Sequence, residues 1–281
     1  MNEIILNERS LQGQYRDMEE FLDCLPGFLR CVSYFMDREE WQILRRSDLF
    51  WALITPEYAL YQIRGNRSDA ARKFKGQILK LTDEPPYWDM EPKQCGCYME
   101  GETDVSGSSL AEAAERTGFV LSFPKSIYED CSVELSHEKE TKKVYSITSA
   151  CYRTQKMFDT GHIDIYTYLR DRYRGSRLSF EKFDPTYGFA GFEQNEIADC
   201  LESFERFAGH ESWTSLKQDI SLHYKEYRPS KQDNWFRGSD YEKENIHKFR
   251  CGNPKRCFGY REGDVFYVLR MERDHSISDK G

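Results

Sequence analysis

Three short segments near the carboxyl end, rich in β-forming residues, constrain the fold more than any other part of this sequence. The stretch reads KFRCGNPKRCFGYREGDVFYVLRMERDH and covers residues 248–275. Turn-forming residues around Pro254 and Gly263 separate the three segments. Successive strand residues point to opposite faces, so aromatic side chains can face a core while arginines from the same strands face away from it. We therefore expect an antiparallel sheet with one apolar face and one outward, cationic face.

The whole chain is expected to be an α+β protein with three regions. Residues 1–104 are predicted to be mainly helical and to end in a proline-rich linker, because helical periodicity stops where prolines and small residues accumulate. Residues 105–220 combine strand-like segments with helices, which predicts a mixed α/β region. Residues 221–281 then form the antiparallel sheet domain.

Three predicted helices illustrate the periodicity. Residues 14–25 place apolar side chains on one helical face, and the Pro-Gly pair at 26–27 is expected to end that helix. A second helix is expected from about residue 38 to residue 46. A third apolar stripe, over residues 193–208, predicts a helix in the mixed region.

The distribution of charge points to the carboxyl end as the place for any polyanion. The chain has 40 basic and 48 acidic residues, a net charge of -8, which argues against a general nucleic-acid coat protein. Residues 246–275 contain seven basic and four acidic residues, so they carry about +3 and the remainder carries about -11. A surface that binds a polyanion is therefore expected within this segment.

Composition and motifs predict a soluble, cytoplasmic protein without a metal or other cofactor. No apolar run is long enough for a membrane span or a signal peptide, so no membrane partner is expected. Nine irregularly spaced cysteines favour reduced thiols over a disulfide framework. Cys95 and Cys97 are one residue apart, which is not the usual spacing of a zinc site, and no glycine-rich phosphate loop occurs.

The order of residues at the carboxyl end resembles the last sheet of the RelE/ParE-type bacterial toxins, the ribosome-dependent mRNA interferases. In that family a basic strand is followed by a strand that opens on arginine and continues with aromatics, and then by an apolar strand that often ends in His or Tyr. The segments KFR (248–250), KRCFGYRE (255–262) and DVFYVLRMERDH (264–275) match these three elements. The resemblance is confined to residues 221–281.

This resemblance implies a bacterial toxin or phage-defence effector that cleaves RNA without a metal, regulated by its amino-terminal region. In such a reaction a ribose 2'-hydroxyl attacks the adjacent phosphate, which requires a base, an acid and fixed positive charge. Arg256 matches the arginine that stabilises the phosphate, and His275 matches the acid. The base is left open among Glu226, Lys225 and Tyr260.

The same resemblance implies that RNA, or RNA on the ribosome, is the partner. Four basic residues are then expected to hold the RNA backbone: Lys248, Arg250, Lys255 and Arg261.

The alternative interpretation is a non-enzymatic protein-binding subunit of a bacterial defence or toxin–antitoxin assembly. The terminal sheet would then be a scaffold, and the acidic body would bind an antitoxin or another defence-system protein. Trp88 and Trp235 lie in polar, turn-rich segments and are candidates for a protein-binding patch, although packing within the protein is the competing interpretation. Sequence-independent RNA binding without cleavage is a third interpretation.

Overall fold

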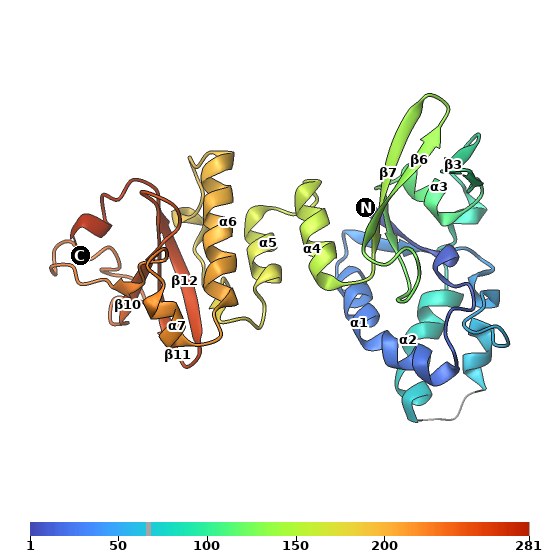
Figure 1. Cartoon of the computed structure of the whole chain (residues 1–281), viewed down its shortest axis with the longest axis horizontal. Helices are drawn as coiled ribbons and strands as arrows, with labels where there is room; N and C mark the ends of the chain where they lie inside the picture. The colour runs from blue at the N-terminus through green and yellow to red at the C-terminus, as the bar shows by residue number, and fades with distance from the viewer. Residues whose placement is uncertain (66–68, 281) are drawn as a thin grey trace. The chain divides into compact units, whose positions relative to one another are not determined.

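The chain divides into two compact units, Met1–Met157 and Phe158–Gly281. The computed structural model describes residues 1–65 and 69–280 (Figure 1). Within these residues the protein is mixed α/β, with seven α-helices and two mixed sheets. The division differs from the three regions expected from the sequence, because hydrogen bonds between strands join residues 98–99 to residues 136–137 across the expected boundary after residue 104. Among the described helices, none is both long and apolar enough to cross a bilayer.

The first unit contains a seven-stranded sheet in the order β2-β1-β5-β7-β6-β3-β4. Strands β2, β1, β5 and β7 are parallel to their neighbours in this series, and β6 and β3 continue the sheet in antiparallel fashion. The strands are β1 (Asn2–Leu6), β2 (Trp41–Leu44), β3 (Tyr98–Glu100), β4 (Thr103–Asp104), β5 (Phe119–Leu121), β6 (Cys131–His137) and β7 (Glu140–Ile147).

The helices of this part of the chain are α1 (Met18–Met36), α2 (Asp69–Asp83), α3 (Ser109–Ala114) and α4 (Ala150–Asp159), of which α4 spans the boundary between the units. Short 3-10 helices are η1 (Glu8–Ser10), η2 (Leu49–Trp51), η3 (Leu60–Arg64) and η4 (Trp88–Met90).

Helix α1 continues through Pro26, so the expectation that the Pro-Gly pair ends this helix is wrong. Proline inside a helix costs about 3 kcal/mol because a hydrogen bond is lost and the ring crowds the preceding turn. The apolar stripe does not stop there, however, since Phe28, Val32 and Phe35 beyond the proline are all buried. Each such side chain stabilises the fold by roughly 1.5–3 kcal/mol when fully buried, which outweighs the local cost.

The helix expected over residues 38–46 is also wrong, because Trp41–Leu44 forms strand β2. This strand pairs in parallel with β1, and Trp41 lies opposite Asn2. A short apolar run fits a buried strand as well as a helix, and the neighbouring strand β1 decides between them.

The second unit contains a five-stranded sheet in the order β8-β12-β11-β10-β9. The prediction of antiparallel strands is confirmed for β9 to β12, whereas the short edge strand β8 was not expected and runs parallel to β12. The strands are β8 (Leu178–Ser179), β9 (Lys225–Glu226), β10 (Ile246–Arg250), β11 (Arg256–Glu262) and β12 (Val265–Glu272). The helices are α5 (Ile165–Arg172), α6 (Gln194–Gly209), α7 (Trp213–Gln218), η5 (Pro185–Tyr187) and η6 (Ser278–Lys280).

A β-bulge interrupts the pairing of β11 with β12. Phe258 lies opposite Arg270, but the next residue, Gly259, lies opposite Val268, so Leu269 is an extra residue on β12. A side chain at position 259 would begin 2.1 Å from the Tyr267 carbonyl oxygen, a separation that real atoms do not tolerate. Glycine therefore permits the close approach of the two strands at this point.

One face of this sheet packs against helices, among them α6, which confirms the helix predicted over residues 193–208. Helix α6 lies beside the sheet in Figure 1. Its buried Phe204 and Phe207 pack against Phe249 and Phe266 of the sheet. Since all four rings are 0% exposed, burial of apolar surface accounts for most of the stability of this layer.

The opposite face of the sheet is covered as well, so the expected outward cationic face is wrong. The loop over residues 228–245 packs Phe236 against Phe258, and the carboxyl-terminal segment adds Ile277. Beneath this cover the side chains of Lys248 and Arg256 are buried. Two layers of apolar contacts therefore enclose the basic residues of the central strands.

We predict that residues 158–281 fold without the first unit, because their apolar core closes within this range. A fragment of residues 221–281 should not fold, since it lacks α5, α6 and α7. Circular dichroism during thermal unfolding tests this: the longer fragment should show one cooperative transition and the shorter one none. Cooperative unfolding of the shorter fragment would contradict the division into these units.

Candidate functional site

Arg256, the predicted phosphate-stabilising residue, is buried beneath the cover of the second sheet. It is 8% exposed, and its Nη1 donates to the carbonyl oxygens of Pro254 (2.9 Å) and Lys255 (2.8 Å). It lies opposite Arg250 on β10 and opposite Glu272 on β12. Burial lowers the pKa of the Arg256 guanidinium, and the neighbouring Arg250 lowers it further. Because Arg256 is buried, it can act on a nearby group through its charge, but among the described residues no open groove lets a substrate contact it.

Lys248, predicted to hold the RNA backbone, is enclosed by the carboxyl-terminal segment. It is 1% exposed, and its Nζ donates to the carbonyl oxygen of Ser278 at 2.6 Å. Glu272 accepts from the backbone N–H groups of Ile277 and Ser278, which fixes the same segment over the sheet. Burial lowers the pKa of Lys248 to about 8, and the charge of Lys225 contributes in the same direction.

His275, the predicted acid, forms a hydrogen bond with the same segment rather than with Arg256. Its Nδ1 lies 2.5 Å from Oδ1 of Asp279, and its backbone adopts a left-handed conformation with φ of 68°. The charge of Asp279 also acts on Arg256, so this carboxylate lies near both residues. Asp279 thus connects the two residues, because it bonds His275 and its charge acts on Arg256.

The two other predicted catalytic residues are separated from Arg256. Tyr260 faces the same side of β11, but four residues further along, about 13 Å at the usual rise of a strand, with Phe258 between them. Its hydroxyl oxygen accepts a hydrogen bond from Nζ of Lys182. Glu226 lies opposite His247, which places it on the other face of the sheet, and it accepts from Arg228 at 2.5 Å. The four residues are not brought together.

Lys255 and Arg261, also predicted to bind RNA, lie in different surroundings. Nζ of Lys255 is 3.0 Å from a carboxylate oxygen of Asp199, and the lysine is buried. Arg261 is exposed, stacks over Trp213 at 4.1 Å, and helps to line an open hollow of about 320 Å³ with His247 on the helix-covered face. Only Arg261 of this pair presents its guanidinium to solvent.

The structure brings Arg250 next to His223, a residue that the sequence analysis did not select. Nη2 of Arg250 donates to Nδ1 of His223 at 3.4 Å, and Nε of Arg250 is buried without a hydrogen-bond partner. His223 and Lys225 are exposed, and Arg250 is half-buried. Together these three residues form what we call the cationic corner, at the edge of the sheet where β9 meets β10.

Electrostatics make the cationic corner receptive to an anion. Burial lowers the pKa of His223, and the charges of Lys225, Arg250 and Arg256 lower it further, so the ring favours its neutral form. Because Arg250 donates to Nδ1, the proton of the neutral ring is on Nε2. An anion at this corner would relieve the repulsion among the basic groups and accept hydrogen bonds from Arg250 and His223.

The pairing of β9 with β10 supplies the signal that could have identified His223. Lys225 lies opposite Lys248, and continuing this antiparallel register by two residues places position 223 opposite Arg250. The residues are 27 positions apart in the chain, so no local spacing joins them. A correct prediction needed the register of a two-residue strand, which hydrophobic alternation does not determine.

Within residues 1–65 and 69–280, no group of three or more His, Cys, Asp or Glu side chains is arranged to hold a metal ion, and all nine cysteines are free. No protein-family model, no curated protein and no solved structure matches this chain.

We predict that Lys248→Met removes a pH-dependent contribution to stability. The folded chain binds the Lys248 proton more weakly, with a pKa of about 8, than the unfolded chain, where a lysine has a pKa of about 10.4. The free energy of unfolding of the parent should therefore rise relative to the variant as the pH increases from about 8 to about 10, by roughly 1–3 kcal/mol. Urea unfolding of both proteins measures this difference, and a constant difference across that range would contradict it.

Proposed function

We propose that the chain is a bacterial toxin or phage-defence effector whose second unit cleaves RNA without a metal ion. The single observation that carries this proposal is the convergence of His223 and Arg250 at an exposed corner that also holds Lys225. A proton-transfer group and fixed positive charge are then within reach of one phosphate. The resemblance of residues 248–275 to the RelE/ParE-type sheet supports the same reaction.

Each residue of the cationic corner has a role in this proposal. Arg250 and Lys225 bind the non-bridging oxygens of the scissile phosphate and stabilise the charge that develops on them. His223 exchanges a proton with the reacting oxygens, because an imidazole titrates near neutral pH. A bound phosphate adds negative charge beside His223, so it should raise the low pKa of this ring towards its ordinary value.

The predicted residues Arg256 and His275 take indirect roles in the same proposal. Arg256 lies behind Arg250 in the register of the sheet and adds positive charge from its buried position. His275 stays bonded to Asp279 in the segment that covers Lys248. The acid–base function is thereby assigned to His223, which lies across β10 from Arg256 and beside Arg250.

The first unit is proposed to regulate this activity. The motive is the charge of the first unit, because residues 1–157 contain 20 basic and 26 acidic residues, carry about -6, and can oppose the binding of RNA electrostatically. This part of the proposal predicts a lower activity in the whole chain than in residues 158–281.

Replacement of the corner residues tests the proposed reaction. In the whole chain, His223→Asn and Arg250→Gln should each slow the cleavage of end-labelled single-stranded RNA, with or without ribosomes, by about 10²–10⁴-fold. The rate of the parent protein should not change when EDTA is added. Product 2',3'-cyclic phosphate, detected by mass spectrometry, would identify attack by the 2'-hydroxyl.

A matched control distinguishes loss of chemistry from loss of structure. His162 also lies in the second unit, bonds Thr160 and is remote in sequence from the corner, so His162→Asn should keep the parental rate. Equal rates for the parent, His223→Asn and Arg250→Gln, with all proteins folded by circular dichroism, would refute the proposal.

An exposed aromatic cluster in the first unit favours a second candidate function, that of a non-enzymatic subunit bound to an antitoxin or defence-system protein. Trp51 is 59% exposed and packs edge-on against Tyr61, with ring centroids 4.8 Å apart. Leu53 and Tyr58 in the same segment are also exposed. Large exposed aromatics are typical of protein interfaces. By contrast, Trp88 is buried, and Trp235 packs on Phe258, so neither forms the patch considered from sequence.

Loss of the Trp51 side chain tests this second function. Proteins encoded beside this chain would be co-expressed with it, and Trp51→Ala should weaken any complex at least about tenfold, as expected when an aromatic interface residue is removed. Ile127→Ala is the control, because Ile127 is 79% exposed in the same unit but outside the cluster. Unchanged affinity in Trp51→Ala would exclude the cluster as the interface.

A further inference from the structure

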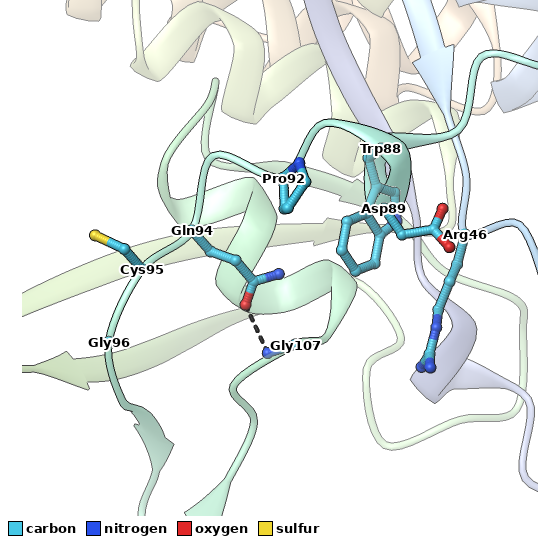
Figure 2. Close-up of a pocket in the computed structure, with 8 residues that line it drawn as sticks. All are labelled: Arg46, Trp88, Asp89, Pro92, Gln94, Cys95, Gly96 and Gly107. Atoms are coloured by element: carbon cyan, nitrogen blue, oxygen red, sulfur yellow. Dashed lines mark hydrogen bonds between the residues drawn. The ribbon is translucent and has the colours of Figure 1, made fainter.

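A hollow of about 390 Å³ in the first unit has the features of a small-molecule site. Figure 2 shows the Trp88 ring lying between Pro92 and Arg46, with the Asp89 carboxylate near the backbone end of the Arg46 side chain, whose guanidinium points away from it. Residues of three separate segments line it: Arg46, Trp88, Asp89, Pro92, Gln94, Cys95, Gly96 and Gly107. Its volume is within the range of ordinary ligand pockets.

The hollow lies where parallel sheets usually bind ligands. Arg46 follows the carboxyl end of β2 by two residues, and Glu8 follows the carboxyl end of the adjacent parallel strand β1 by two residues. The charge of Arg46 acts on Glu8, which places the two residues near each other. In open α/β sheets, loops at the carboxyl ends of the strands form the crevice for the ligand.

The walls of the hollow are held in place by hydrogen bonds. Gln94 accepts from the backbone N–H of Gly107 at 2.6 Å, the bond drawn in Figure 2, and donates to the carbonyl oxygen of Ser108. Asp89 accepts from the N–H (2.9 Å) and the hydroxyl (2.5 Å) of Ser47. These bonds preform the cavity, so a ligand would not have to order it.

Two buried polar atoms near this place lack a partner. Trp88 is 3% exposed, yet its Nε1–H has no hydrogen-bond acceptor. Oε2 of Glu8 is also buried without a partner, while Oε1 accepts from the N–H of Ser109. Because both atoms are buried, a ligand in the hollow contacts the ring of Trp88 rather than this N–H, and the ring reports on its presence.

The charges at the rim are of both signs. The ion pair of Arg46 with Asp48 uses Nε, at 3.0 Å, which leaves the two Nη groups for a ligand. Each oxygen of Asp89 accepts one hydrogen bond from Ser47 and can accept another. A purely anionic ligand would meet Asp48 and Asp89, and a purely cationic ligand would meet Arg46. A ligand that carries both charges satisfies both sides.

We propose that this hollow binds a zwitterionic amino acid. The ligand carboxylate lies against Arg46, its ammonium group lies against Asp89, and its side chain packs on the rings of Trp88 and Pro92, which line the hollow. This site is independent of the RNA cleavage proposed for the second unit, and it gives the first unit a ligand of its own.

Nuclear magnetic resonance of the Trp88 indole N–H tests the proposal in the whole chain. A mixture of the twenty standard amino acids at millimolar concentration should shift this signal, and single amino acids then identify the one responsible. Arg46→Gln and Asp89→Asn should each weaken its binding about tenfold to a hundredfold, the usual effect of losing a hydrogen bond to a charged group. The N-acetylated and the carboxamide derivatives of the same amino acid should bind more weakly by a similar factor.

Control variants separate binding from folding. Arg30→Gln changes an exposed arginine of α1 in the same unit and should bind as the parent does. Arg46→Lys retains the positive charge but loses the paired N–H groups, so its affinity should lie between those of the parent and Arg46→Gln. The absence of any shift with the mixture, or blocked derivatives that bind as tightly as the free amino acid, would overturn the proposal. Neither result depends on whether the second unit cleaves RNA.

Discussion

Pairs of like charges across the strands of the second sheet are the constraint on which the rest of this unit depends. Arg250 lies opposite Arg256, and Lys225 lies opposite Lys248. Like charges directly opposite one another destabilise an antiparallel pair. The fold offsets this repulsion with the carboxylates of Glu272 and Asp279, both of which act on Arg256. The repulsion that remains lies at the exposed edge of β9, where an incoming anion can meet it.

The covering segments decide which basic groups are available for chemistry. The bond from Lys248 to Ser278 and the two bonds accepted by Glu272 hold the carboxyl-terminal segment over the middle of the sheet. As a result, the solvent exposure of the basic residues increases from the buried Arg256 to the exposed His223. Arg256, with 8% exposure, can act on a substrate only through its electrostatic field, whereas the exposed His223 can contact it.

The sequence predicted the elements that depend on a local pattern. It did not predict the features that depend on the register between strands or on contacts distant in the chain. The stripe of Phe204 and Phe207 predicted α6, and the alternation around Gly263 predicted β11 and β12, because periodicity and turn chemistry act over a few residues. The path of α1 through Pro26 depended on burial further along the helix, which a local rule omits. The burial of Arg256 depended on a polar loop whose packing no periodicity encodes.

The bulge at Gly259 changes which residues of β12 face each side of the sheet. Before the bulge, Phe266 and Val268 point towards the helices, and a regular strand would send residues 270 and 272 in the same direction. Because Leu269 is inserted, Met271 faces the helices instead, and Glu272 emerges on the side of Arg256. One supernumerary residue thus sets which side of the sheet receives the compensating carboxylate: the same sequence paired without a bulge would turn Glu272 towards the phenylalanines and leave the arginines without their counterion.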